Sequence, residues 1–77
     1  MNIVMIKKYD DNYIDISKII AVCKVREGGE GFFFNIYIGV DYISLTDSDK
    51  KRLSALRERI IKDWMEVAND KKYLCTN

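Results

Sequence analysis

The stretch FFFNIYIGVDYISL, residues 32–45, decides the fold that the sequence predicts. Its first half, Phe32 to Ile38, is rich in aromatic and β-branched residues, which favour extended strands. Gly39-Val40-Asp41 follows as a turn, and Tyr42 to Leu45 returns as a further strand. Two strands joined by so short a turn predict an antiparallel hairpin.

Three more strands are expected before this hairpin. They cover Asn2 to Lys8, the short alternating run Tyr13 to Ile16, and the β-branched run Ile19 to Arg26. Asp10-Asp11-Asn12 is a turn signal between the first two. The glycine-rich stretch Glu27 to Gly31 lies between two apolar runs and therefore predicts a hairpin loop.

A helix is expected after the last strand, because the apolar period changes from about two to about 3.6 residues. Thr46 is expected as its N-cap, with Asp49 three residues on in the place of a capping-box acid. The helix is predicted over 47–68, with Asn69 as its stop and a tail over 69–77. The apolar stripe consists of Leu53, Leu56, Ile60, Trp64 and Val67, widened by Ile61, Met65 and Ala68.

These elements predict one α+β domain over 1–77, with strands and turns in 2–46. An antiparallel, meander-like sheet of three to five strands should pack against the long C-terminal helix, since this is the simplest way to bury both apolar faces. A core this small gives modest stability, which favours support from a partner or from homo-oligomerisation.

Charge and hydropathy exclude some classes of protein. Thirteen basic and twelve acidic residues give a net charge of +1, which argues against a strongly basic nucleic-acid binder. No apolar stretch approaches the roughly 20 residues that span a bilayer, and the N-terminus has no signal-peptide pattern. A soluble, cytoplasmic protein with no membrane partner is expected.

No enzyme chemistry is expected. The chain contains no histidine, so serine–histidine and cysteine–histidine pairs are impossible. Cys23 and Cys75 lack the spacing of a zinc site, and both are expected to be reduced thiols. Asp10 and Asp11 are expected as solvated turn residues. Neither a catalytic residue, a cofactor nor a metal is predicted.

A binding surface is suggested by the alternation of side chains along the strands. Phe32, Phe34, Ile36 and Ile38 share one face, which should meet the helix, and Ile19, Ala21, Cys23 and Val25 do so in the neighbouring strand. The second face should carry a protein partner or a second copy, unless other chain segments cover it. The residues expected there are Ile20, Val22, Phe33 and Tyr37.

Arg57 is the other candidate contact, because it falls inside the apolar stripe of the helix. It is expected either to extend to water, to pair with Asp15 or Asp41, or to lie in an interface. A nucleic-acid-binding or transcription-modulating module is the alternative function. It would use the basic first half of the helix, with Lys50, Lys51, Arg52 and Arg59 as contacts.

The whole chain resembles the small accessory proteins of bacteriophages and other mobile elements. The resemblance rests on its short length, its composition and the runs YIDISKIIAV (13–22), FFFNIYIGVDYISL (32–45) and TDSDKKRLSALRERIIKDW (46–64). It implies a noncatalytic protein in the host cytoplasm that inhibits or modulates a host or defence-system protein by occlusion.

Overall fold

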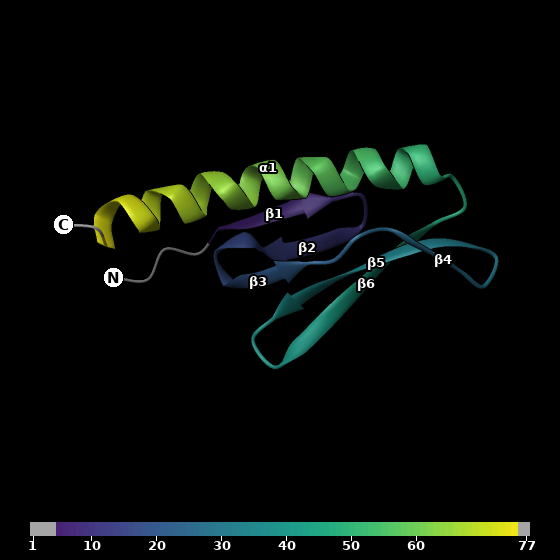
Figure 1. The fold of residues 1–77 in the computed structure, drawn as a ribbon, viewed down its shortest axis with the longest axis horizontal. Helices are drawn as coiled ribbons and strands as arrows, with labels where there is room; N and C mark the ends of the chain where they lie inside the picture. Colours follow the sequence, from purple (N-terminus) through teal and green to yellow (C-terminus); the bar gives the residue numbers. More distant parts are fainter. Residues whose placement is uncertain (1–4, 76–77) are drawn as a thin grey trace.

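The computed structural model describes the backbone of residues 5–75 and the side chains of residues 5–67. Strands come first and a single long helix comes last, which confirms the predicted α+β class (Figure 1). The elements are β1 (Ile6–Tyr9), β2 (Asn12–Asp15), the 3-10 helix η1 (Ile16–Lys18), β3 (Ile19–Val22), β4 (Arg26–Gly28), β5 (Gly31–Ile38), β6 (Asp41–Asp47) and α1 (Lys50–Cys75).

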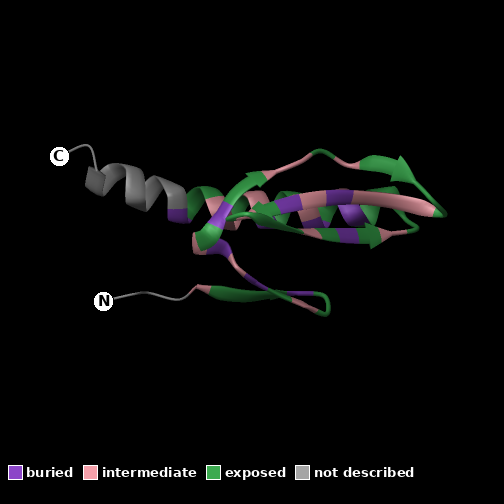
Figure 2. Ribbon diagram, turned by 90° about the horizontal axis from the view of Figure 1, so that it is seen from below, coloured by how far each residue is buried: buried purple, intermediate pink, exposed green. Residues whose placement is uncertain are grey.

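The strands form two antiparallel sheets where one was predicted. β1 and β2 make a separate hairpin, and β5 is the centre of a four-stranded sheet, with β6 on one side and β3 and β4 on the other. The break falls at η1, where the Asp15 carboxylate accepts a hydrogen bond from the Ser17 amide and caps the turn. The hairpin therefore forms a second β layer beside α1 (Figures 1 and 2).

The predicted strand Ile19 to Arg26 is irregular, and this overturns one site prediction. The register of β3 against β5 shifts between Ile19 and Ala21. Ala21 then lies opposite Tyr37, and Val22 opposite the buried Ile36. One inserted residue exchanges the two faces of a strand. Val22 therefore packs against the core, and its predicted place on the second face is wrong.

The core lies between α1 and the two sheets (Figure 2). Along β5 the predicted alternation is confirmed, since Phe34 and Ile36 are fully buried while Phe32 and Ile38 pack partly against the same cluster. Tyr9, expected near a turn, is also buried. The buried residues are Tyr9, Ile14, Ile16, Ile19, Phe34, Ile36, Leu45, Leu53, Leu56, Ile60 and Val67.

The helix begins three residues later than predicted, and its cap is Asp49 rather than Thr46. The Asp49 carboxylate accepts hydrogen bonds from the backbone amides of Lys51 and Arg52, at 2.9 and 3.3 Å. Thr46 belongs to β6 and pairs with Phe33. Pairing with β5 therefore extends β6 through Thr46, the residue that the local sequence favours as the helix N-cap.

The helix also ends later than predicted, at Cys75. Asn69 does not stop it, because asparagine costs at most about 0.7 kcal/mol relative to alanine inside a helix and no glycine or proline follows. Within the stripe, Trp64 is half-buried and Met65 is exposed, so Met65 does not widen the apolar face. The Ala68 and Cys75 side chains lie outside the described residues.

Candidate protein-binding surface

The outer face of the larger sheet, which points away from α1, is built by β5 and β6. The two strands pair without a register shift. Tyr37 and Tyr42 lie opposite each other with ring centroids 5.6 Å apart, and the Ser44 hydroxyl donates to the Asn35 side-chain oxygen. The predicted exposure of Tyr37 on this second face is confirmed.

The β5–β6 turn adds an exposed apolar residue that the sequence reading did not select. Gly39 and Val40 form a two-residue loop, and Gly39 has a φ of 63°, which glycine adopts without strain. Val40 is 99% exposed at the tip of this loop. Turn positions usually carry polar residues, so a valine in this turn is the sequence feature that could have indicated an exposed apolar residue here.

Ile20 lies at the same end of the sheet. It occupies the irregular step between Ile19, which pairs with Ile38, and Ala21, which pairs with Tyr37. Ile20 and Tyr42 are each 59% exposed. The structure therefore brings four exposed apolar residues to the turn end of the sheet, here called the end cluster: Ile20, Tyr37, Val40 and Tyr42.

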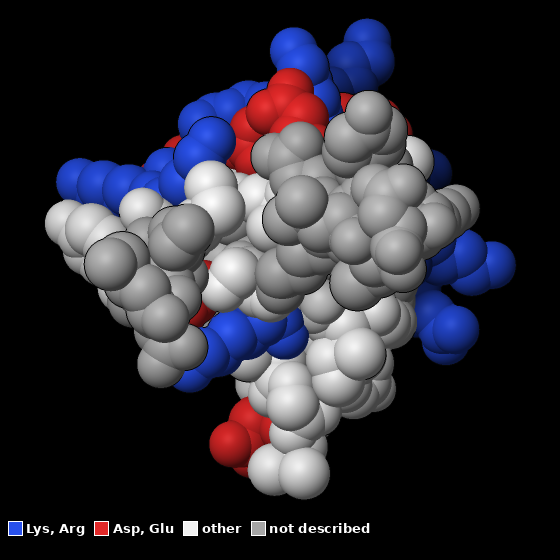
Figure 3. All heavy atoms as spheres, turned by 90° about the vertical axis from the view of Figure 1, so that its left-hand side faces the viewer, with Lys and Arg blue, Asp and Glu red and all other residues white. Residues whose placement is uncertain are grey.

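In the view along the helix axis, most charged side chains lie away from the β5–β6 turn (Figure 3). Lysine, arginine and acidic groups occupy the upper part, the sides and the centre of the picture, whereas the β5–β6 turn, lowest in the picture, is mostly uncharged with one acidic group projecting from it. An apolar end favours contact with protein, because nucleic-acid contacts need cations against phosphates.

Phe33 lies on the outer face but is half-buried by its own chain. A methyl group added at Gly28 would lie 2.7 Å from the Phe33 ring, so the ring covers this glycine. Phe33 also lines a shallow hollow of about 270 Å³ together with Cys23, Arg26 and Tyr37, and Cys23 is a free thiol. Phe33 and Tyr37, a member of the end cluster, therefore line the same hollow of the outer face.

Arg57 has a structural partner that no sequence pattern could supply. Its Nε donates to the carbonyl oxygen of Cys23 at 2.7 Å, and its Nη1 lies 3.9 Å from a Glu58 oxygen. Trp64 Nε1 donates to the Ile19 carbonyl at 3.1 Å. Both acceptors lie at the ends of the irregular β3 segment, whose ladder bonding is interrupted. The two helix residues therefore hold this segment in place.

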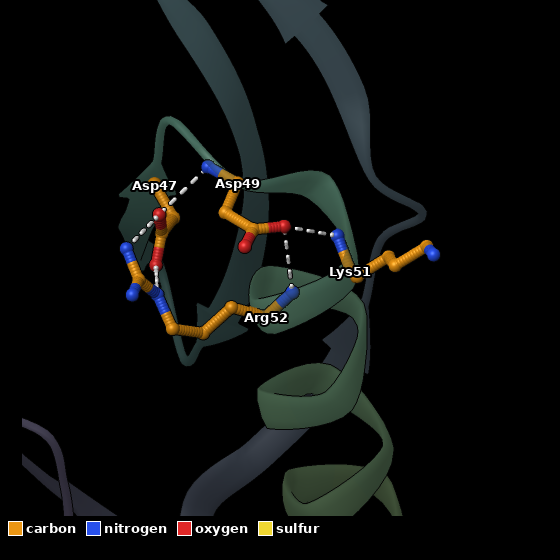
Figure 4. Close-up of polar contacts among 4 residues, drawn as sticks. All are labelled: Asp47, Asp49, Lys51 and Arg52. Atoms are coloured by element: carbon orange, nitrogen blue, oxygen red, sulfur yellow. Dashed lines mark hydrogen bonds and ion pairs between the residues drawn. The ribbon is translucent and has the colours of Figure 1, made fainter.

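Arg52, one of the predicted nucleic-acid contacts, forms a bidentate ion pair with Asp47 at the start of the helix (Figure 4). Its Nε and Nη2 donate to the two carboxylate oxygens at 2.7 and 2.9 Å. The Arg52 hydrogen bond, with further bonds from the Asp49 and Ser48 amides, lowers the pKa of Asp47 to about 2. This pair fastens the end of β6 to the first turn of α1.

Two more of the predicted contacts face aromatic rings of the same chain. Lys50 Nζ lies 5.9 Å from the ring centre of Phe32, and the Arg59 guanidinium lies 5.6 Å from that of Tyr9. Lys51 is exposed. Three of the four basic residues therefore have partners within the chain, and these partners belong to different strands.

Asp63 connects α1 to the hairpin of β1 and β2. Tyr9 donates its hydroxyl proton to an Asp63 oxygen at 2.5 Å, and Lys7 Nζ lies 3.5 Å from the other oxygen. Burial, followed by the hydrogen bond to Asp63, raises the pKa of the Tyr9 hydroxyl. Asp63 thus attaches β1 to α1.

Because of the Asp47–Arg52 pair, the stability of the wild-type chain should decrease as the pH falls through the acid range. The pKa of Asp47 is about 2 in the folded chain and about 3.9 when unfolded, so its contribution is complete above about pH 4 and disappears near pH 2. Asp47→Asn should lower the melting temperature at pH 6 and not at pH 2. Thermal melts over this range check it, with Asp41→Asn as the matched control. An equal difference in melting temperature between Asp47→Asn and the wild type at both pH values would contradict the stabilising role assigned to the Asp47–Arg52 pair.

No family model, curated protein or solved structure matches the chain. Among the described residues, no three histidine, cysteine or acidic side chains are grouped as a metal site requires. The described helix is not apolar enough to cross a membrane.

Proposed function

We propose that the chain is a noncatalytic protein-binding module that inhibits or modulates a host or defence-system protein by occluding part of its surface. The observation that carries the proposal is the end cluster. Its four apolar side chains belong to three neighbouring strands and the turn between two of them, and they are exposed at one end of the sheet.

The energetics of these side chains support binding. Tyrosine is enriched at interface hot spots, because its ring buries a large area at a small cost in side-chain entropy. Tyr37 and Tyr42 are already ordered against each other across β5 and β6. Val40, at the tip of a two-residue loop, loses little conformational freedom on contact because the turn is fixed.

The charges support a protein partner over a nucleic acid. Arg52 is paired with Asp47, and Lys50 and Arg59 lie over rings of their own chain. Binding through the end cluster should tolerate salt, whereas binding through phosphates weakens steeply as salt rises.

The test is an affinity capture from host lysate with the double variant Val40→Asp, Tyr42→Asp. Each carboxylate would be desolvated without a partner in the interface, so capture should fall at least tenfold. Circular dichroism should show an unchanged fold, because both residues are exposed. Lys62→Asp, at an exposed position of α1 that neither proposal uses, is the matched control and should retain capture.

The captured protein is then reconstituted with the purified chain at low and high salt. Retained capture by the double variant would refute the end cluster as the contact. Loss of binding at high salt, with nucleic acid in the captured material, would favour the nucleic-acid function. Light scattering that shows a dimer broken by the double variant would assign the cluster to a second copy.

A further inference from the structure

The outer edge of β6 offers a second recognition element beside the end cluster. β6 pairs with β5 along its whole length, and within the described chain no strand pairs with its other side. The strand has seven residues, no register shift, no proline and no lysine. Short length, β-bulges, proline and lysine are the features that usually prevent another strand from adding to an exposed edge, and β6 has none of them.

The turn geometry identifies the backbone groups on this edge. A two-residue turn makes Ile38 and Asp41 a hydrogen-bonded pair, and such pairs alternate along an antiparallel ladder. The N–H and C=O groups of Tyr42, Ser44 and Thr46 therefore point away from β5. The printed bond from the Cys23 amide to the Asn35 carbonyl fits this alternation, because Asn35 pairs with Ser44 and directs its own groups to the opposite side of β5.

The two ends of the edge differ in charge. At the C-terminal end, Asp47 and Asp49 are engaged by Arg52 and by helix amides, while Lys50 and Lys51 are exposed. The Arg52 side chain is itself 67% exposed. At the N-terminal end, the exposed charge is Asp41. A strand added antiparallel to β6 would place its N-terminus near the cations and its C-terminus near Asp41.

We propose that the partner contributes an extended segment that pairs antiparallel with the β6 edge, acidic at its N-terminal end and basic at its C-terminal end. This inference rests on the proposed protein-binding function and specifies how the partner is held. Outward groups of Tyr42, Ser44 and Thr46 supply up to six main-chain hydrogen bonds, because each residue has one donor and one acceptor. The Tyr42 ring lies on the outer face beside the added strand, which makes the edge continuous with the end cluster.

Two synthetic decapeptides test the polarity. One carries two aspartates, three Thr-Val repeats and two lysines from N- to C-terminus, and the other has the aspartates and lysines exchanged. In an NMR titration of the intact chain, the first should shift the amide signals of Tyr42, Ser44 and Thr46 and bind about threefold more tightly, as exposed ion pairs allow. Equal affinities, or shifts confined to β3 and β4, would overturn the proposal.

Ser44→Pro tests the pairing itself. The Ser44 N–H points away from β5, so proline keeps the internal ladder and removes the central donor of the edge. Peptide binding should be lost with the circular dichroism spectrum unchanged, and Ser44→Thr, the matched control, should bind as the wild type does. If the proline variant unfolds, hydrogen exchange of the wild-type Ser44 amide decides: the first peptide should slow it, and unchanged exchange refutes the proposal.

The two proposals fail differently. Capture that is lost in the Val40→Asp, Tyr42→Asp variant but retained by folded Ser44→Pro would remove edge pairing and leave the protein-binding function standing. Edge binding of the peptides without any protein capture would remove the proposed function alone.

Discussion

Phe34→Ala is expected to cost about 3–5 kcal/mol and to leave the domain largely unfolded at room temperature. Phe34 is 0% exposed, on the central strand of the larger sheet, and its loss would leave a cavity between β5 and α1. The measurement is urea denaturation followed by circular dichroism. Tyr42→Ala, on the adjacent strand but outward, is the matched control and should cost less than about 1 kcal/mol.

A folded Phe34→Ala variant with a midpoint near that of the wild type would contradict the placement of this ring. It would mean that β5 presents its other face to the helix. The same result would remove the end cluster, because Phe34 and Tyr37 are assigned to opposite faces by one alternation.

Trp64→Ala should cost about 3 kcal/mol, the lower end of the range for removing a large aromatic, since Trp64 is half-buried. The substitution removes packing against the core and leaves the Ile19 carbonyl without its indole donor. Trp64→Phe separates the two effects. It keeps most of the packing and should cost about 1 kcal/mol, the usual net value of one hydrogen bond.

The check is again a denaturant midpoint for both variants. A Trp64→Ala midpoint shifted no more than that of Met65→Ala, an exposed neighbour on the same helix, would show that Trp64 does not anchor the sheet. Equal losses for Trp64→Ala and Trp64→Phe would mean that the hydrogen bond to Ile19, and not packing, provides the stabilisation.

The candidate surface shows how far sequence reasoning reached. Tyr37 and Ile20 were selected by alternation and are exposed, and both belong to the end cluster. Val22 was selected by the same rule and faces the core, because the shift beyond Ile19 reverses the rule for one strand. The sequence predicts Val40 only as a turn residue, and the folded hairpin places it beside the two tyrosines.

For the helix, too, part of the candidate site could be predicted from the sequence and part could not. The unusual place of Arg57 inside the apolar stripe was visible in the sequence, but its partner was not. The acceptor is a main-chain carbonyl at Cys23, and a backbone group leaves no mark in the identity of the residue that carries it. Asp15 and Asp41, the carboxylates considered for it, were chosen by charge alone.

The order of strands and helix, the buried face of β5 and most of the helix stripe can be predicted from the amino-acid sequence. These follow from periods of two and 3.6 residues, which are properties of neighbouring positions. Tertiary structure alone decided the division into two sheets, the register of β3 and the gathering of the end cluster. These depend on pairings between distant segments, where the balance of ladder bonds, bulges and core packing selects one register among several with similar local propensity.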